Sequence, residues 1–167
     1  AVISVPVIDD AFVEGNETLQ LTLGTVTSGD SDVSVSGVPA SINIVDSELA
    51  NLTVADVTRN ESDGTLIFTV ELDVATPDPF IVNYSFADGS ATGGTDYDNT
   101  GGTVSFAGTA GEQQSVIVNI TNDGLVESTE TFTLNLVSAV VDASDTAVGS
   151  ITDDDTGPTL NITSDDT

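Results

Sequence analysis

Apolar and polar residues alternate along this chain in short runs, and each run is separated from the next by turn-forming residues. Val116, Val118 and Ile120 alternate with polar neighbours, and Phe132 and Leu134 continue the same period of two in the following run. This period is typical of β-strands with one buried face. Pro, Gly and Asp between the runs mark turns. The pattern predicts strands at 2–8, 17–23, 41–45, 52–58, 65–72, 80–86, 103–106, 114–121, 131–138 and 147–151.

No helical period extends beyond one turn, so the fold class predicted is all-β. Short strands with frequent turn signals favour an antiparallel, immunoglobulin-like sandwich of two sheets, with about seven strands in each copy.

One strand–loop–strand unit occurs twice. The run that ends in Val7 leads into Asp10, Glu14 and Glu17, and about 113 residues later an apolar run leads into the same carboxylate spacing at Asp123, Glu127 and Glu130. We therefore expect residues 1–48 to be the C-terminal half of one repeat and residues 49–155 to be a complete repeat. Residues 156–167 are expected to be a linker and the first strand of a following repeat.

The charge restricts the partners. The 167 residues carry a formal charge of −27, with a single Lys or Arg and 28 Asp or Glu. Such a surface repels phosphate groups, so nucleic acid is excluded as a partner and anionic membrane surfaces are disfavoured. No apolar run reaches the length of a membrane span, so direct membrane insertion is not expected. Cations are the expected partners.

The acidic loops are part of a longer pattern that is similar to Calx-beta domains, the calcium-binding modules of sodium/calcium exchangers and of many large bacterial surface proteins. The resemblance covers residues 52–155 as a whole copy and 1–48 as the latter half of one. It is carried by Glu61 before Asp63-Gly64, Asp88-Gly89-Ser90-Ala91-Thr92, Thr95-Asp96-Tyr97, Gly102-Thr103-Val104-Ser105-Phe106, Asn122-Asp123, Glu127, Glu130-Thr131-Phe132 and Ile151-Thr152-Asp153-Asp154-Asp155.

The resemblance implies a calcium site at one end of the sandwich, between loops and the segment that leaves the last strand. In the complete copy the implied ligands are Glu61, Asp96, Asp123, Glu127, Glu130, Asp153, Asp154 and Asp155; in the partial copy they are Asp10, Glu14, Glu17, Asp46 and Glu48. Their oxygen atoms suit Ca²⁺ or Mg²⁺, whereas the absence of His and Cys argues against zinc or copper. In the partial copy Ser47 replaces the middle carboxylate of the closing triplet, which makes a poorer site.

These features predict a calcium-stabilised structural repeat of a large extracellular or cell-surface protein, an adhesin or a filament. Its partners would be neighbouring repeats of the same polypeptide, with self-assembly into a filament and a surface or glycan ligand as further candidates. A regulatory calcium sensor and a carbohydrate- or receptor-binding adhesion module remain alternatives, and salt adaptation is a separate explanation of the acidity. We do not expect an enzyme, because the chain lacks His, Cys and Lys and its acids form one like-charged cluster.

Overall fold

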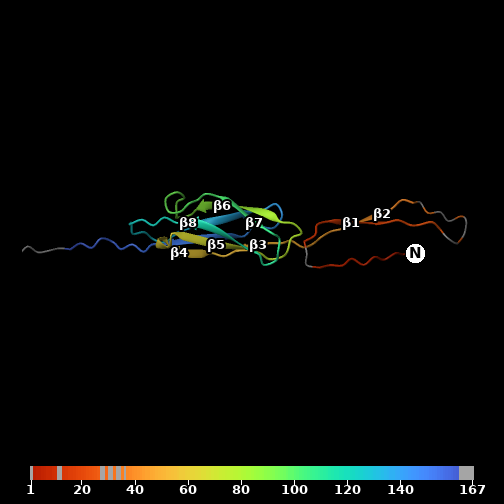
Figure 1. The fold of residues 1–167 in the computed structure, drawn as a ribbon, viewed down its shortest axis with the longest axis horizontal. Helices are drawn as coiled ribbons and strands as arrows, with labels where there is room; N and C mark the ends of the chain where they lie inside the picture. The colour runs from red at the N-terminus through yellow and green to blue at the C-terminus, as the bar shows by residue number, and fades with distance from the viewer. Residues whose placement is uncertain are drawn as a thin grey trace, which may run out of the picture.

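The computed structural model describes residues 2–10, 13–26, 29, 32, 35 and 37–161 as an all-β chain (Figure 1). The strands are β1 (Glu17–Leu21), β2 (Ala40–Ile44), β3 (Leu52–Val54), β4 (Val57–Asn60), β5 (Thr65–Leu72), β6 (Phe80–Asp88), β7 (Gly102–Phe106), β8 (Gln113–Asn119), β9 (Glu130–Val137) and β10 (Thr146–Thr152), with one 3₁₀ turn, η1 (Glu61–Asp63). This confirms the predicted fold class. No helix in the described part of the chain is long and apolar enough to cross a membrane.

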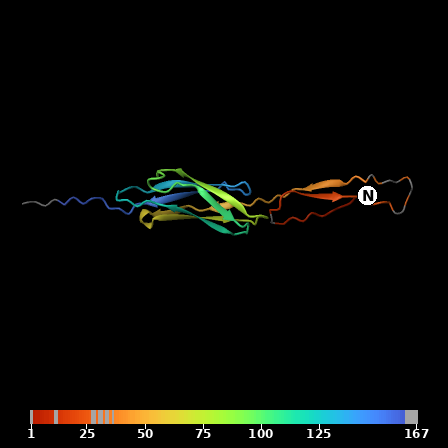
Figure 2. The ribbon, with the colours of Figure 1, turned by 45° about the horizontal axis from the view of Figure 1, so that its top comes forward.

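Strands β3 to β10 form a sandwich of two layers, which Figure 2 shows nearly edge-on. One sheet has the order β4-β10-β9-β6-β7 and the other has the order β3-β5-β8. Alternate residues of the central strands β5 and β9 are buried, as the period of two predicts. Phe132 is at the centre of the core, where its ring stacks on Tyr97 at 4.0 Å and meets Phe68 and Phe86 edge-on.

The strand predicted at 52–58 is in fact two strands that belong to different sheets. β3 pairs with β5, and β4 pairs with β10 in a parallel arrangement, so the sandwich is not wholly antiparallel. Two aspartates stabilise the crossing, because Asp145 accepts a hydrogen bond from the Val54 amide at 2.9 Å and Asp56 accepts one from the Val148 amide at 2.7 Å. The inward positions change register at this crossing, from Leu52 and Val54 in β3 to Val57 in β4, and the prediction of one strand overlooked this shift.

The prediction of a strand at 2–8 is wrong, because these residues form no strand and their apolar side chains are exposed. In the complete sandwich the corresponding run lies in β8, which is paired along its length with β5. Among the described residues, the N-terminal segment (residues 2–48) has no strand equivalent to β5. A strand needs a hydrogen-bonded neighbour, and alternation alone does not supply one.

The N-terminal segment nevertheless repeats the pairing of the complete sandwich. β1 pairs with β2 so that Leu19 is opposite Ile42, and β9 pairs with β10 so that Phe132 is opposite Gly149 at the equivalent position. This hairpin-like sheet lies beyond the end of the sandwich opposite to the one at which the C-terminal segment leaves (Figure 1). The linker and first strand of a further copy predicted at 156–167 lie partly outside the described residues.

Gly149 makes room for the ring of Phe132. A Cβ atom at Gly149 would lie 2.7 Å from Phe132 Cε1, within the buried core. We expect Gly149→Ala to lower the free energy of unfolding by about 1–3 kcal/mol, the usual cost of overpacking. Urea denaturation in EDTA would measure this. Gly124→Ala is the matched control because a Cβ there meets nothing within 4 Å, and equal losses in the two variants would contradict the packing argument.

Candidate metal centre

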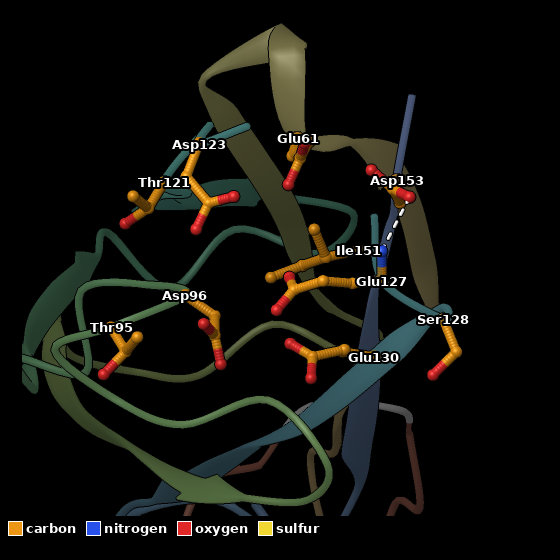
Figure 3. A pocket seen from close by; sticks show the side chains of 10 residues that line it. All are labelled: Glu61, Thr95, Asp96, Thr121, Asp123, Glu127, Ser128, Glu130, Ile151 and Asp153. Carbon is orange, nitrogen blue, oxygen red and sulfur yellow. Dashed lines mark hydrogen bonds between the residues drawn. The ribbon is translucent and has the colours of Figure 1, made fainter. Parts of the chain in front are cut away.

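Carboxylates from four separate parts of the complete copy converge at the pole of the sandwich where β10 ends. Figure 3 shows these side chains around one pocket, with those of Asp96, Glu127 and Glu130 pointing toward one another. The parts are the η1 turn, the loop after β6, the connection from β8 to β9, and the segment after β10. The residues that line the pocket are Glu61, Thr95, Asp96, Thr121, Asp123, Glu127, Ser128, Glu130, Ile151 and Asp153.

The η1 turn directs Glu61 inward. Asn60 caps the turn by accepting a hydrogen bond from the Ser62 amide at 3.0 Å, and the Asp63 side chain accepts one from the Asn60 amide. Gly64 ends the turn in the left-handed region, at φ 71°, where glycine is favoured. The result is a carboxylate side chain that is only 4 % exposed.

The aromatic core holds two further acids in place. Tyr97 directly follows Asp96, and Phe132 is two residues after Glu130, so the stacked pair of rings fixes the backbone beside both carboxylates. The Tyr97 hydroxyl donates a hydrogen bond to Asp88 at 2.7 Å. Asp96 itself accepts a hydrogen bond from the Thr92 amide at 2.7 Å. Tyr97 thus positions the neighbouring carboxylate of Asp96. The sequence places Tyr97 in the motif Thr95-Asp96-Tyr97 but does not mark it as a functional residue.

Two groups of three carboxylates have suitable spacing for metal binding among the described residues. Glu61, Asp153 and Asp155 form one group, and Asp96, Glu127 and Glu130 form the other; within each group one ligand atom per residue lies within 4.8 Å of the others. Like charges at about 4 Å repel by roughly 1–4 kcal/mol per pair, depending on the effective dielectric constant. A bound divalent cation would replace this repulsion by attraction.

Two buried oxygens of the first group are left without partners. Glu61 Oε1 and Asp155 Oδ2 are inaccessible to solvent and accept no hydrogen bond in the described part of the chain. Buried carboxylate oxygens are normally paired, because desolvation without a partner is costly. Oxygens of this type, without competing donors, are the ligands that hard cations such as Ca²⁺ prefer. The residues present therefore fit a divalent cation.

The same crowding changes the acidity of the site. Burial, together with the charges of Asp153 and Asp155, raises the pKa of Glu61 to about 7. Desolvation followed by the charge of Asp123 raises the pKa of Glu127, and desolvation followed by the charge of Asp96 raises that of Glu130. Without a cation, the site is therefore easier to protonate than ordinary carboxylates.

Seven of the eight acids expected in the complete copy are gathered at this pole. Asp123 lines the pocket, and its carboxylate also accepts a hydrogen bond from the Leu125 amide at 2.7 Å. Asp154 is exposed and belongs to neither group of three. The Asp155 amide donates a hydrogen bond to the Asp153 side chain at 2.9 Å, so these two acids form a local turn within the cluster while Asp154 lies exposed between them.

The five acids expected in the N-terminal segment also come together. One pocket is lined by Asp10, Glu14, Glu17, Asp46 and Glu48, together with Val7, Ile8, Asp9, Gly15, Ile44, Val45 and Ser47. The carboxylate of Asp46 accepts hydrogen bonds from the amides of Glu14 and Gly15 at 2.9 and 3.0 Å.

The complete copy makes the corresponding bond, from the Glu127 amide to Asp153 at 2.8 Å, which is drawn as the dashed line in Figure 3. In the N-terminal segment, the bond from Gly15 and the neighbouring Glu48 lower the pKa of Asp46 to about 2, whereas the charge of Asp10 raises that of Glu14. Among the described residues this second cluster has no equivalents of Glu61 and Asp96, so it is the less complete of the two.

The raised pKa values predict an unusual pH dependence for the metal-free protein. An ordinary glutamate in the unfolded chain titrates near 4.5, but Glu61 in the folded chain titrates near 7. Between these values the folded state holds a proton that the unfolded state releases, so its stability falls as pH rises. We expect the unfolding temperature in EDTA to decrease from about pH 5 to about pH 8.

Glu61→Gln should weaken this dependence because it removes the carboxyl group whose raised pKa lies within this pH range. Asp78→Asn removes one exposed charge far from the site and should leave the dependence unchanged. A metal-free protein that becomes more stable over this pH range would contradict the electrostatic description of the site.

Comparison with known proteins identifies the family of the chain. The sequence matches the Calx-beta domain over residues 1–48 and 48–155. The chain therefore belongs to the Calx-beta domain family. A search of curated proteins found no match.

Solved structures with the same fold include the apo form of the Calx CBD1 domain, at 25 % identity and a TM-score of 0.58, covering 65 % of this chain and all of that one. CBD12 from CALX1.2 is also 25 % identical, with a TM-score of 0.57 over 63 % of this chain and 46 % of its own. A structure described as the calcium binding domain CBD12 of CALX1.1 is 24 % identical, with a TM-score of 0.54 over 63 % of this chain and 45 % of its own, and supports the fold alone.

Proposed function

We propose that this chain is a calcium-binding structural repeat. The observation that carries the proposal is the pair of buried carboxylate oxygens, Glu61 Oε1 and Asp155 Oδ2, which have no hydrogen-bond partner among the described residues. Asp153 lies with them in one of the two groups of three acids. The membership of the Calx-beta domain family supports the same ion.

The residues that would hold calcium are those whose oxygens converge at the pole. Glu61, Asp153 and Asp155 form the more buried group, while Asp96, Glu127 and Glu130 form the more accessible one. Ca²⁺ takes about 6–8 oxygen ligands with flexible geometry, so clusters of this kind suit it better than they suit Mg²⁺, which needs a strict octahedron. When bound, the ion supplies the positive charge that this pole lacks.

A structural role follows from where the ligands are in the chain. Asp153 and Asp155 belong to the segment that leaves the sandwich, and Glu127 belongs to a loop with few other contacts. An ion that binds both would fix the loop and the exit segment to the same pole. In a tandem array this would stiffen each junction, as expected for a surface protein, adhesin or filament outside the cell. The proposed boundaries are 1–48, 49–155 and 156–167.

The second candidate is a regulatory calcium sensor, which the similarity to the CBD1 and CBD12 domains favours. The affinity for calcium distinguishes the sensor from the structural repeat. The test is the unfolding temperature measured against free calcium from about 0.1 µM to about 10 mM, with MgCl₂ and KCl as parallel titrants.

A rise centred in the range of about 0.1–1 mM, with little response to magnesium, supports the structural repeat. A rise complete below about 10 µM supports the sensor. Equal stabilisation by KCl would instead support salt adaptation as the reason for the acidity.

A further inference from the structure

The outward face of the five-stranded sheet is free of charged side chains, in a chain whose formal charge is −27. The pairing register and the alternation of burial define this face, which we call the neutral face. Its residues are Thr58, Asn60, Ile81, Asn83, Ser85, Ala87, Thr103, Ser105, Thr131, Thr133, Asn135, Val137, Thr146, Val148, Ser150 and Thr152.

The charged residues within these strands all occupy the other register. Arg59 and Glu130 are each opposite Ile151, and Asp88 is opposite Phe132, where Ile151 and Phe132 are core residues. Of the other acids of the complete copy, Glu71 lies in β5 of the other sheet, and Asp56 lies between β3 and β4, where it accepts a hydrogen bond from the Val148 amide. The remaining acids lie in turns or loops. The charged residues of these strands therefore lie on the inward side because of the alternation along each strand, and not because acids are rare in this part of the chain.

We propose that the neutral face is a lateral contact surface for a second copy of this chain. Two molecules that each carry many negative charges repel one another, and repulsion is weakest where the approaching surfaces have no charge. The face offers both donors and acceptors through its Thr, Ser and Asn side chains, which makes it complementary to itself. Ile81 and Val137 are 58 % and 60 % exposed and supply apolar contact.

The composition of the face favours a protein surface over a sugar. None of its residues is aromatic, and aromatic rings are the usual platforms for stacked, amphipathic ligands. A second copy needs no such platform, because two flat β-surfaces of matching residues can pack directly. The inference does not depend on calcium binding.

The expected contact is weak in the isolated chain. Five strands about 4.8 Å apart and roughly 25 Å long make a flat patch of about 500 Å² per molecule, below the roughly 800 Å² of stable interfaces. The dissociation constant should therefore be on the order of 0.1–1 mM. Repetition along a tandem chain would multiply such contacts through effective concentration.

The test is sedimentation equilibrium of the whole chain from about 20 µM to about 1 mM, in EDTA and in calcium, at about 0.15 M salt. We expect the average mass to rise above the 17.0 kDa of one chain as concentration increases. The double variant Asn83→Asp and Asn135→Asp keeps side-chain shape but adds charge to the neutral face, and should weaken association at least about tenfold. Its unfolding temperature should match that of the wild type.

Two control variants locate the contact. Asn119→Asp adds the same charge to the outward side of β8, on the other sheet, and should leave association unchanged. Ile42→Asp tests the half-exposed apolar side of the sheet formed by β1 and β2. The proposal is overturned if the wild type stays at 17.0 kDa throughout, or if Ile42→Asp or Asn119→Asp abolishes association while the double variant does not. Binding of neutral glycans by a monomeric wild type, lost in the double variant, would overturn it in favour of a sugar ligand.

Discussion

Replacing Phe132 with alanine is expected to lower the free energy of unfolding by about 3–5 kcal/mol, the typical cost of removing a buried phenylalanine side chain. Phe132 is 1 % exposed, stacks on Tyr97 and contacts Phe68 and Phe86 edge-on. No other ring makes all of these contacts among the described residues, so its removal leaves a cavity between the two sheets. Urea denaturation in EDTA measures the loss without any contribution from bound metal.

Phe132→Ala should also weaken metal binding, although Phe132 is not a ligand. The stacked Tyr97 is next to Asp96 in the chain, so a loosened stack lets this carboxylate move away from Glu130. The control is Ile117→Ala, on a side chain that is 60 % exposed, where the change should stay within about 0.5 kcal/mol. A loss below about 1 kcal/mol for Phe132→Ala would show that the ring is not central to the core.

Removal of calcium is the second change with a large expected effect. Ligand that binds only the folded state stabilises it by about 4 kcal/mol per site when its free concentration is 1,000 times the dissociation constant. A domain is stable by only about 5–15 kcal/mol in total, so EDTA should lower the urea midpoint substantially. The loss should be larger at pH 8 than at pH 5, because protons compensate for the missing ion at the raised pKa of Glu61.

This second prediction requires a comparison of denaturation curves in EDTA, calcium and magnesium at constant ionic strength. Magnesium should restore little of the stability, since Mg²⁺ requires near-ideal octahedral geometry and gives up its waters reluctantly, whereas Ca²⁺ accepts a flexible set of oxygens. Identical curves in EDTA and calcium would mean that the carboxylates at the pole do not bind the ion.

The sequence predicted most of the strands because one face of each is buried, and burial imposes a period of two. The strand at 65–72 and its partners agree with the structure to within one or two residues at most ends. Alternation was read as one strand over residues 52–58, although the inward positions shift from Leu52 and Val54 to Val57 where the chain changes sheet. It also predicted a strand at 2–8, for which the described residues provide no partner.

The sequence predicted where the candidate site lies, but not which of its acids are buried and which are exposed. The repeated spacing of Asp123, Glu127 and Glu130 located the acidic loop, and the structure places this loop beside the segment after β10. The burial of Glu61 could not be read from the sequence, because it depends on a capped 3₁₀ turn directed into the pole. Asp154 was indistinguishable from its neighbours in the sequence, yet its side chain is exposed.

The most direct test of the account is the calorimetric titration of calcium into metal-free wild type, Glu61→Gln and Asp78→Asn at about pH 7.5. Glu61→Gln removes the buried charge of the first group of acids, whereas Asp78→Asn removes an exposed charge outside both groups. We expect Glu61→Gln to weaken calcium binding at least about tenfold and Asp78→Asn to change it less than about twofold. A wild type that binds no calcium at millimolar concentration, or equal losses in the two variants, would contradict a calcium site at this pole.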